Sequence, residues 1–276
     1  MLRLLNIEFH KLKHNRASKV LTVIYFGLLT SITLIAMIKF PFGDGVPLAE
    51  IGIFNFPYIW HFNTYVAGIL KFFLLVVIVS MMSNEYSHKT LKQNLIDGLS
   101  KKEFILSKFY TVIAFAAIST VFVFIVSLIL GLIYSDYNEF NIIFSELEYL
   151  VAFFIKLIGF FSFGLFMGIL VKRSAFAIGG IVVWYLTEWI IHAILGWRFV
   201  SWDLAQKIKN FLPLESMQNL IKEPGTRLSA VQNLAKQIGK DLSKDYSVDF
   251  TEILIVLVWT FIFIYLSYRL LQRRDL

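Results

Sequence analysis

The sequence contains no cysteine among its 276 residues, and it is poor in charge, with only 16% Asp, Glu, Lys and Arg. The absence of cysteine excludes disulfide bonds and thiolate metal ligands. Soluble globular domains contain about 25% charged residues, so the low charge excludes an ordinary soluble enzyme. Apolar residues dominate instead: 58% of the chain is hydrophobic, and 28 residues are phenylalanine. This composition indicates an integral membrane protein.

Sequence signatures of nucleotide and metal chemistry are also missing. The only Gly-Lys pair, Gly239-Lys240, is followed by Asp and lacks the upstream glycine of a phosphate-binding loop. The segment EWIIH, from Glu188 to His192, lacks the first histidine of the metalloprotease motif HExxH. The five His and six Met residues show no metal-ligand spacing. We therefore predict a chain with no catalytic residue, no metal site and no bound cofactor.

Six apolar stretches are each close to the roughly 20 residues that a helix needs to cross a bilayer. Because a bilayer offers the backbone no hydrogen-bond partners, these stretches should be α-helices. They cover residues 20–38, 64–82, 109–134, 149–171, 174–196 and 251–268. In the fourth stretch, Gly164 and Gly168 form a small-xxx-small pair that favours close packing of a neighbouring helix. The sequence thus predicts a single all-α transmembrane domain over residues 1–276.

Lys and Arg gather on one side of these predicted spans. They precede the first span, occur throughout the second loop, form the tight turn at Lys172-Arg173 and follow the last span. The loop at residues 135–148, on the other side, has none and is acidic. By the positive-inside rule, both termini should lie in the cytoplasm, as in a multi-pass protein of the bacterial cytoplasmic (inner) membrane. These loops account for the net charge of +7, and no basic module is long enough to bind nucleic acid.

The first 19 residues, 1–19, predict an amphipathic helix that lies at the membrane interface. Four apolar residues share one helical face: Leu2, Leu5, Phe9 and Leu12. Basic residues are available to the other face: Arg3, Lys13 and Arg16. Such a helix places its apolar face in acyl chains and its bases near anionic headgroups. The alternative is a frayed basic tail whose only role is to fix topology.

Between the second and third spans, residues 84–99 predict a short amphipathic helix with a defined end. Its apolar face carries three leucines: Leu91, Leu95 and Leu99. Gly98 can adopt the left-handed conformation that ends a helix, and Ser100 with Glu103 forms a capping box for a new helix that continues into the third span. These signals predict a rigid connection through which a push on the short helix moves the third span. The alternative is an idle surface helix.

These two cytoplasmic segments resemble those of the permease subunit of type-2 ABC (ATP-binding-cassette) exporters. The coupling-helix pattern of that family is matched by Glu85, Thr90, Leu91, Ser100, Lys101, Lys102, Phe104 and Lys108. Its basic interfacial helix is matched by Glu8, Lys11 and Arg16. The sequence departs from the family at His88-Lys89, where a Gly is common, and in the unusual length of the loop before the last span.

The resemblance implies that residues 84–99 are a coupling helix that docks on a separate cytoplasmic ABC ATPase, which binds the ATP and Mg. On this basis we assign ATPase coupling to eight residues: Glu85, Thr90, Leu91, Leu95, Ser100, Lys101, Glu103 and Phe104. We expect replacement of Leu91 and Leu95 by Asp to uncouple ATP hydrolysis from the spans while insertion remains intact. The usual assembly of the family pairs two ATPases with two permeases, the second permease being another copy of this chain or a related one.

The loop at residues 197–249 is far longer than the usual connection between two helices. Its apolar spacing predicts one or two amphipathic helices on the outer leaflet, and the family resemblance places a re-entrant hairpin at residues 199–221. We expect this outer loop to act as a gate or as a docking site for an extracytoplasmic protein. The alternative is a solvated helical cap.

Four polar residues fall inside the predicted spans: Lys71, Lys156, Glu188 and His192. A charge at mid-bilayer costs about 2.5 to 3.5 kcal/mol on insertion scales, so each charge needs a partner. From the helical rise of about 1.5 Å per residue, the two lysines and the glutamate lie at a similar depth. We hypothesise that Glu188 neutralises Lys71 or Lys156. Glu188 and His192 lie one turn apart, and a structural hydrogen bond is the favoured interpretation of that pair.

The sequence therefore predicts a permease subunit of an ATP-driven exporter whose cargo is amphipathic, such as a peptide, a lipid or a drug-like molecule. A first alternative is a force transmitter, in which ATP-driven closure moves the outer loop against an extracytoplasmic partner and no solute crosses. A second is an ion-coupled secondary transporter that uses the buried Lys and Glu residues, although the broken inverted repeats of such proteins are not evident. Apolar walls and long loops fit every cargo class alike.

Overall fold

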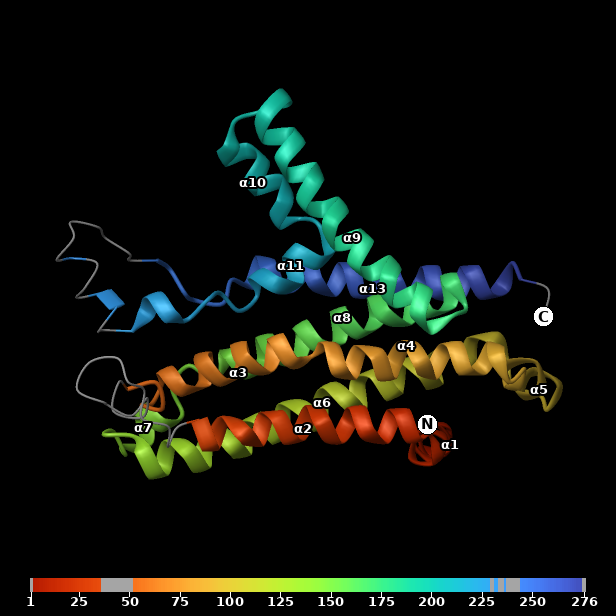
Figure 1. Cartoon of the computed structure of the whole chain (residues 1–276), viewed down its shortest axis with the longest axis horizontal. Coiled ribbons are helices and arrows are strands. Elements are labelled where there is room, and N and C mark those ends of the chain that lie inside the picture. Colours follow the sequence, from red (N-terminus) through yellow and green to blue (C-terminus); the bar gives the residue numbers. More distant parts are fainter. Residues whose placement is uncertain (1, 36–51, 229–230, 233–235, 237–243, 275–276) are drawn as a thin grey trace.

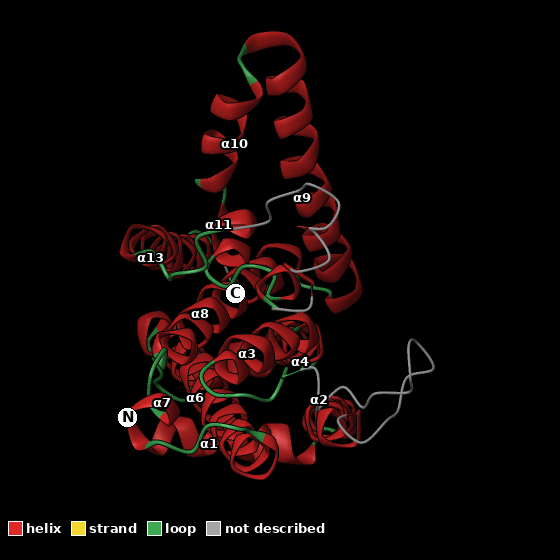
Figure 2. Ribbon diagram, turned by 90° about the vertical axis from the view of Figure 1, so that its left-hand side faces the viewer, coloured by secondary structure: helices red, strands yellow, loops and turns green. Residues whose placement is uncertain are grey.

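The structure, a computed structural model, describes residues 2–35, 52–228, 231–232, 236 and 244–274, and these residues are helical with no strand. They form a bundle from which a helical arm projects (Figures 1 and 2). The elements in chain order are α1 (Leu2–His14), α2 (Arg16–Ile35), α3 (Tyr58–Leu70), α4 (Phe72–Ser87), α5 (Thr90–Ile96), α6 (Lys101–Tyr134), α7 (Phe140–Ile143), α8 (Glu148–Val171), α9 (Ser174–Ile194), the π-helical turn η2 (Leu195–Phe199), α10 (Trp202–Asn210), α11 (Pro213–Asn219), the 3-10 turn η3 (Gly225–Arg227) and α13 (Phe250–Gln272).

The long helices of the bundle lie along one axis, which gives the molecule two ends (Figure 1). We call the end with α1, α5 and the last turn of α13 the basic end. The opposite end, with α7 and the first turns of α3 and α13, is the acidic end. Both predicted amphipathic segments of the basic loops therefore lie at the same end of the bundle.

Helix α8 lies at the centre of the bundle and contacts α3, α4, α6, α9 and α13 (Figure 2). This position follows from its sequence, which is apolar on every face. In the apolar stretch of α7 and α8, 72% of the most hydrophobic window is buried, whereas only 11% is buried in the stretch formed by α9 and η2. The first is therefore an internal helix, and the second presents an apolar surface to its surroundings.

Glycines allow α4 to approach α8 closely, as the sequence predicts. A Cβ atom added at Gly164 would lie 2.4 Å from Cδ1 of Leu75, and one at Gly168 would lie 3.1 Å from Cβ of Met82. Both distances are shorter than ordinary packing, so a larger residue at either position requires Leu75 or Met82 to move.

Four stretches of the described residues are long and apolar enough to cross a membrane, and the bent pair α3 and α4 makes a fifth if it counts as one span. The six predicted spans are therefore only partly confirmed. The first, residues 20–38, overlaps α2, and its residues 36–38 lie outside the described part of the chain. The third to sixth predicted spans each fall on a long helix.

The second predicted span, residues 64–82, is not one straight helix. It is divided into α3 and α4, whose axes differ by 42° at a break that falls on Lys71. The break lies near the middle of the pair, so it places Lys71, a half-buried cation, at mid-length along the bundle. Neither Pro nor Gly stands at this position, which is why the sequence did not predict the bend.

Residues 174–210, which we call the arm, form a helical hairpin that leaves the bundle (Figures 1 and 2). Its outgoing leg is α9 and η2, the fifth predicted span, and α10 returns along it. Gly196 permits the tight contact between the legs, because a Cβ atom there would lie 2.5 Å from the ring of Trp202. Ser201 caps α10 by accepting a hydrogen bond from the backbone N–H of Leu204. The hairpin expected at residues 199–221 thus begins earlier, because its first leg is the fifth predicted span itself.

Candidate functional site

The connection between α4 and α6 has the local structure that the sequence predicts. Helix α5 follows Lys89, which adopts a left-handed conformation with φ of 55°. Gly98, with φ of 97°, ends α5, and the N–H groups of Gly98 and Leu99 donate to the carbonyl oxygens of Leu95 and Asn94. This is the pattern of a Schellman motif, and it confirms Gly98 as the stop.

The predicted capping box is confirmed at the start of α6. The backbone N–H of Glu103 donates to Oγ of Ser100, and the backbone N–H of Ser100 donates to Oε2 of Glu103 at 2.9 Å. Because α6 then runs without interruption from Lys101 to Tyr134, the end of α5 is joined directly to a helix that extends through the whole bundle.

A cluster of buried charges joins α1, α4 and α6 at the basic end. Nζ of Lys108 lies 2.6 Å from Oε2 of Glu8 and 2.6 Å from Oε1 of Glu85, and Nζ of Lys11 lies 2.8 Å from the same Glu85 oxygen. Lys108 is fully buried, and both carboxylates are almost so. We call Glu8, Lys11, Glu85 and Lys108 the charge cluster. Two acids and two bases balance, so the cluster neutralises its own charge within the protein.

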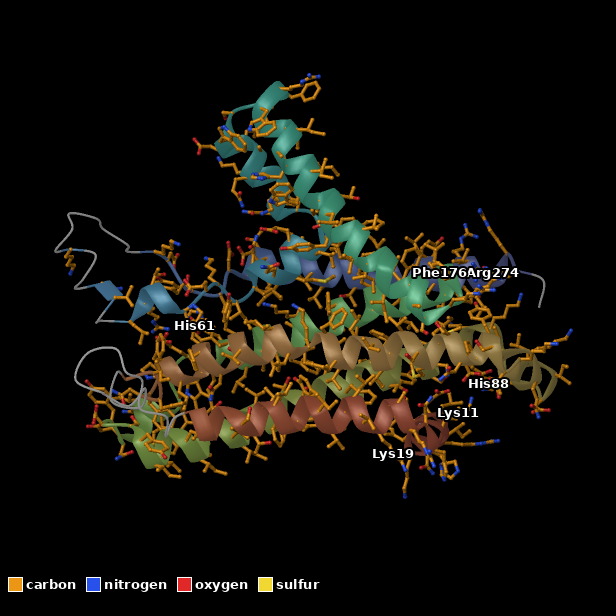
Figure 3. All side chains as sticks on the ribbon, in the orientation of Figure 1. Lys11, Lys19, His61, His88, Phe176 and Arg274 are labelled. Atoms are coloured by element: carbon orange, nitrogen blue, oxygen red, sulfur yellow. The ribbon has the colours of Figure 1, made fainter. Side chains whose placement is uncertain are left out.

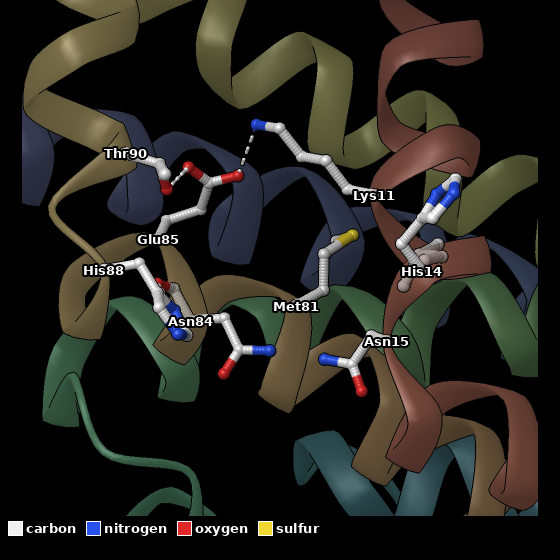
Figure 4. Close-up of a pocket in the computed structure, with 9 residues that line it drawn as sticks. Lys11, His14, Asn15, Met81, Asn84, Glu85, His88 and Thr90 are labelled. Carbon is white, nitrogen blue, oxygen red and sulfur yellow. Dashed lines mark hydrogen bonds and ion pairs between the residues drawn. The ribbon is translucent and has the colours of Figure 1, made fainter.

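Glu85 also binds α5 to the cluster. Its second oxygen, Oε2, accepts a hydrogen bond from Oγ1 of Thr90 at 2.6 Å (Figure 4). The same oxygen accepts a hydrogen bond from Nδ2 of Asn94 at 3.4 Å. One carboxylate therefore holds the interfacial helix α1, the short helix α5 and the long helix α6 together. The sequence pattern contained Glu8, Lys11, Glu85 and Lys108 as separate matches to a family, but their convergence is visible only in the structure, and Asn94 carried no signal at all.

The leucine face of α5 points into the protein. Leu91 is buried and Leu95 is partly buried against the core, as is Leu99. Phe104 is buried as well, beneath Nζ of Lys108. Leu91 and Phe104 therefore hold α5 on the bundle and do not lie on a surface that another protein could contact. The exposed side of α5 is formed by Lys92, Gln93, Ile96 and Asp97.

The side chain of Lys101, another predicted coupling residue, binds the C-terminal end of the chain. Its Nζ donates to the carbonyl oxygens of Gln272, at 3.3 Å, and Arg274, at 3.0 Å. The guanidinium of Arg274 in turn donates to Oη of Tyr86 and to the carbonyl oxygens of Ile169 and Leu170. These contacts join α13 to α4, α6 and α8 at the basic end (Figure 3). Sequence reasoning did not identify Arg274, because a terminal arginine has no local pattern that sets it apart.

Two clefts open beside the charge cluster. One of about 340 Å³ lies between α1 and the end of α4, where Lys11, Asn84 and Glu85 line it (Figure 4). The other, of about 530 Å³, lies between α1 and the α5–α6 turn and is lined by Arg3, Asp97 and Glu103 among others. Within the described residues, no group of three or more His, Asp or Glu side chains could hold a metal ion.

At the acidic end, the segment before the last helix is fastened to the bundle by polar contacts. Oη of Tyr58 donates to the carbonyl oxygen of Pro224. A ring nitrogen of His61 lies 2.8 Å from the carbonyl oxygen of Lys222. The Arg227 guanidinium forms two hydrogen bonds with the carboxylate of Glu146, at 2.6 and 2.7 Å. The described part of the predicted outer loop is therefore attached to α3 and to the start of α8.

The predicted ion pair between Glu188 and a lysine is wrong. The Glu188 carboxylate accepts hydrogen bonds from Nε1 of Trp184 at 2.8 Å and from the backbone N–H groups of Leu214 and Glu215, both at 3.0 Å. It thus caps the start of α11 and joins the arm to the bundle. His192 makes no hydrogen bond to Glu188; its ring packs on Trp202, with the ring centroids 5.7 Å apart.

Lys71 and Lys156 have no carboxylate partner among the described residues. Nζ of Lys156, which is buried, donates to the carbonyl oxygen of Gln218 at 3.2 Å. Nζ of Lys71 lies 4.6 Å from the centroid of the Phe160 ring. Such a cation–π contact contributes about 0.5 to 2 kcal/mol, less than the cost of about 2.5 to 3.5 kcal/mol for a mid-bilayer lysine. The protein therefore compensates the charge of Lys71 incompletely.

Several long apolar helices define a multi-pass membrane protein, and α1 is attached to the bundle by buried ion pairs. The sequence model of the family described as "ABC-2 family transporter protein" matches residues 6–276, nearly the whole chain. The chain belongs to this family. It is therefore a permease component of an ABC transporter, and membership implies an ATP-binding-cassette partner. A comparison with curated proteins found no match.

Proposed function

We propose that this permease is the membrane subunit of an ATP-driven exporter of amphipathic cargo in the bacterial cytoplasmic membrane. The basic end would face the cytoplasm with both termini, because Lys and Arg are concentrated there. Helix α5 would be the coupling helix, and a separate ATPase would bind the ATP and Mg. A second permease, either a copy of this chain or a related one, would complete the membrane part.

The exposed tip of α5 is the observation that supports docking of an ATPase. Ile96 is 75% exposed, although it is a large apolar residue on a helix of only seven residues. Lys92, Gln93 and Asp97, which surround it, are exposed and polar. A central apolar anchor inside a polar rim is typical of an energetic hot spot in a protein–protein interface. The buried leucine face leaves this surface as the one that α5 offers to a partner.

The charge cluster supports the transmission of a push from α5 to the bundle. Thr90 and Asn94 bind α5 to Glu85 at the end of α4, and a short turn connects the far end of α5 to the capped start of α6. Through Lys108 the same carboxylate is held against α6 and, with Glu8, against α1. Movement of α5 alone would break the hydrogen bonds of Thr90 and Asn94 to Glu85, so we expect α4 to move with it, together with α1 and α6 through the ion pairs of the cluster.

Docking can be tested by replacing the apolar anchor. The full chain carrying Ile96→Asp is purified from native membranes, and the ATPase subunit that accompanies it is quantified along with its ATP hydrolysis. We expect the variant to fold normally and to lose the ATPase, because a charge would be buried in the interface. Phe140→Asp, at a residue 73% exposed on the acidic end, is the matched control and should retain it. An Ile96→Asp permease that keeps its ATPase in full would rule out this docking surface.

The orientation can be tested without altering any native thiol, since the chain has no cysteine. Single cysteines are introduced at Lys92 on α5 and at Tyr137 on the acidic end, both of which are exposed. A membrane-impermeant maleimide should label Tyr137→Cys in intact cells and label Lys92→Cys only after the cells are opened. Labelling of Lys92→Cys in intact cells would refute the proposal, because α5 could not then meet a cytoplasmic ATPase.

A force-transmitting role remains the second candidate, and the attachment at the acidic end favours it. Tyr58 and Arg227 fasten the segment at 222–228 to α3 and α8, so motion of the bundle would be passed to that segment. An extracytoplasmic protein bound there would be moved without any solute crossing. Reconstituted vesicles distinguish the two candidates, since only an exporter accumulates an amphipathic solute on ATP addition.

A further inference from the structure

The incompletely compensated cation at the bend of α3 and α4 borders a cavity. The cavity has a volume of about 230 Å³ and lies where α4, α8, α9 and α11 meet. Its lining combines one cation, Lys71, with the aromatic rings of Phe160 and Tyr185 and the side chain of Gln218. No element of this set belongs to the charge cluster or to the exposed tip of α5.

A second cation lies behind the first. Nζ of Lys156 donates to the backbone carbonyl oxygen of Gln218, and it lies within 3.6 Å of a Cβ atom built at Gly68, one turn before Lys71. Phe160, which Lys71 covers, is one turn after Lys156 on α8. Both ammonium groups therefore lie between the α3–α4 bend and α8, and no carboxylate of the described residues faces them.

The Glu188 carboxylate contacts the lining of this cavity through the backbone N–H of Leu214, and its oxygens are already hydrogen-bonded. Its two oxygens accept three hydrogen bonds from Trp184, Leu214 and Glu215. It therefore offers little capacity to balance the lysines. The positive charge at the cavity is left for a group from outside the chain.

We propose that this cavity binds the anionic headgroup, phosphate or carboxylate, of an amphiphile whose apolar chain lies along α9. The cavity is smaller than the roughly 300 to 1,000 Å³ of pockets that enclose a drug-sized ligand, so it fits a headgroup and not the whole molecule. Its rim is apolar and about half exposed, at Phe72, Val182 and Tyr185. Phe72 lies on α4, and Val182 and Tyr185 lie on α9, so in the proposed orientation the cavity would open sideways to acyl chains and not to water.

The site assigns roles to particular groups. Lys71 would form an ion pair with the anionic headgroup, and the positive charge of Lys156 would add to the electrostatic attraction. The side-chain amide of Gln218 can donate a hydrogen bond to the headgroup. The rings of Phe160 and Tyr185 would exclude water and strengthen the attraction between the charges. That such a ligand is exported rests on the proposed function, but binding itself requires neither ATP nor an ATPase.

Binding is tested with the purified full-length chain in uncharged detergent micelles, in the absence of any ATPase. Four probes are compared by native mass spectrometry: oleate, oleoyl lysophosphatidate, the neutral amide oleamide and inorganic phosphate alone. We expect both anionic amphiphiles to bind at least about tenfold more tightly than oleamide. Inorganic phosphate should bind weakly, because it cannot use the apolar rim.

Variants connect that preference to the lysines. Lys71→Gln should reduce the preference for oleate over oleamide to about the level of equal binding, whereas Lys71→Arg should keep it because the charge remains. Lys102→Gln, an exposed lysine at the basic end, is the control and should change nothing. Thermal unfolding verifies that each variant is folded, and the Arg variant keeps the test valid if Gln destabilises the bend.

The possible results separate cleanly. Equal binding of oleate and oleamide by the native chain, or an unchanged preference in Lys71→Gln, would overturn the proposal. Binding of inorganic phosphate as tight as that of lysophosphatidate would also overturn it, because the site would then take free anions. Since no ATPase is present, a failure here leaves the docking test on Ile96 untouched, and the reverse also holds.

Discussion

Removal of the ammonium group of Lys108 should destabilise the basic end more than any other single change of charge there. In Lys108→Met, a side chain of similar length fills the same buried space, but Glu8 and Glu85 lose the cation that lies 2.6 Å from each. Lys11 remains 2.8 Å from Glu85 and 4.0 Å from Glu8. One positive charge must then balance two buried carboxylates.

The magnitude follows from the burial of the cluster. Loss of one partner from a buried ion pair costs about 3 to 5 kcal/mol, because the remaining charge stays buried without compensation. Lys11→Met removes the same charge from the same cluster, but the Lys11 side chain is 35% exposed. In Lys11→Met the buried Lys108 ammonium stays 2.6 Å from both carboxylates, so this variant is the matched control and should cost less. Glu8→Gln added to Lys108→Met should recover part of the loss by removing the uncompensated acid.

The measurement is the free energy of unfolding from denaturant titration of the purified chain in micelles. Limited digestion with trypsin supplies a local readout, because Arg3 and Lys13 on α1 are exposed and become better substrates when α1 leaves the bundle. Equal costs for Lys108→Met and Lys11→Met would refute the reasoning, since the argument depends on the difference in burial.

Four further single substitutions test the packing and the contacts of Glu188. Leu91→Asp should lower the stability of the chain by several kcal/mol in the same titration, because it places a charge in the core instead of in an interface, and wild-type stability in this variant would show that Leu91 faces outward after all. Gly164→Val should destabilise the protein by about 1 to 3 kcal/mol through overpacking against α4. Gly179→Ala should stabilise it by about 0.5 to 1 kcal/mol, because a Cβ atom there meets nothing within 4 Å. A melting temperature that moves in the same direction for both variants would contradict this. Glu188→Gln should lower the stability of the chain by about 1 to 3 kcal/mol, because an amide nitrogen then opposes an N–H donor. Addition of Lys71→Met should not restore that stability. Recovery in the double variant would instead support an ion pair between Glu188 and Lys71.

Local features of the basic loops were predictable because their signals are short and chemical. Ser100 and Glu103 specify a helix start, and Gly98 specifies a helix end, within a few residues of chain. The ends of the fourth apolar stretch were also accurate, since the predicted 149–171 compares with the helix at Glu148–Val171. Apolar length alone fixes such a boundary, because polar residues flank it directly.

The direction in which a helix face points is a different kind of information. The spacing of Leu91 and Leu95 shows that they share a face, and both readings of that face, toward a partner or toward the bundle, satisfy the same spacing. The structure decides for the bundle, and it leaves Ile96 exposed on the other side. The spacing could not choose between these two orientations, because a helix attached to the bundle and a helix docked on a partner require the same amphipathic pattern.

Charge pairing inside the membrane fails for a related reason. The helical rise gives the depth of Lys71, Lys156 and Glu188, but depth is one coordinate of three, and the rotation of each helix about its axis is set by the packing of all its neighbours. Glu188 faces α11, whose first N–H groups need an acceptor. The Glu188 carboxylate therefore binds these backbone N–H groups and not a lysine. As a result, Lys71 lies at the rim of a cavity, where its ammonium group contacts the aromatic ring of Phe160. A sequence can indicate that three charged residues occur at a similar depth along the helices. Which of them remains available to a ligand depends on which helix termini lie beside them in the folded bundle.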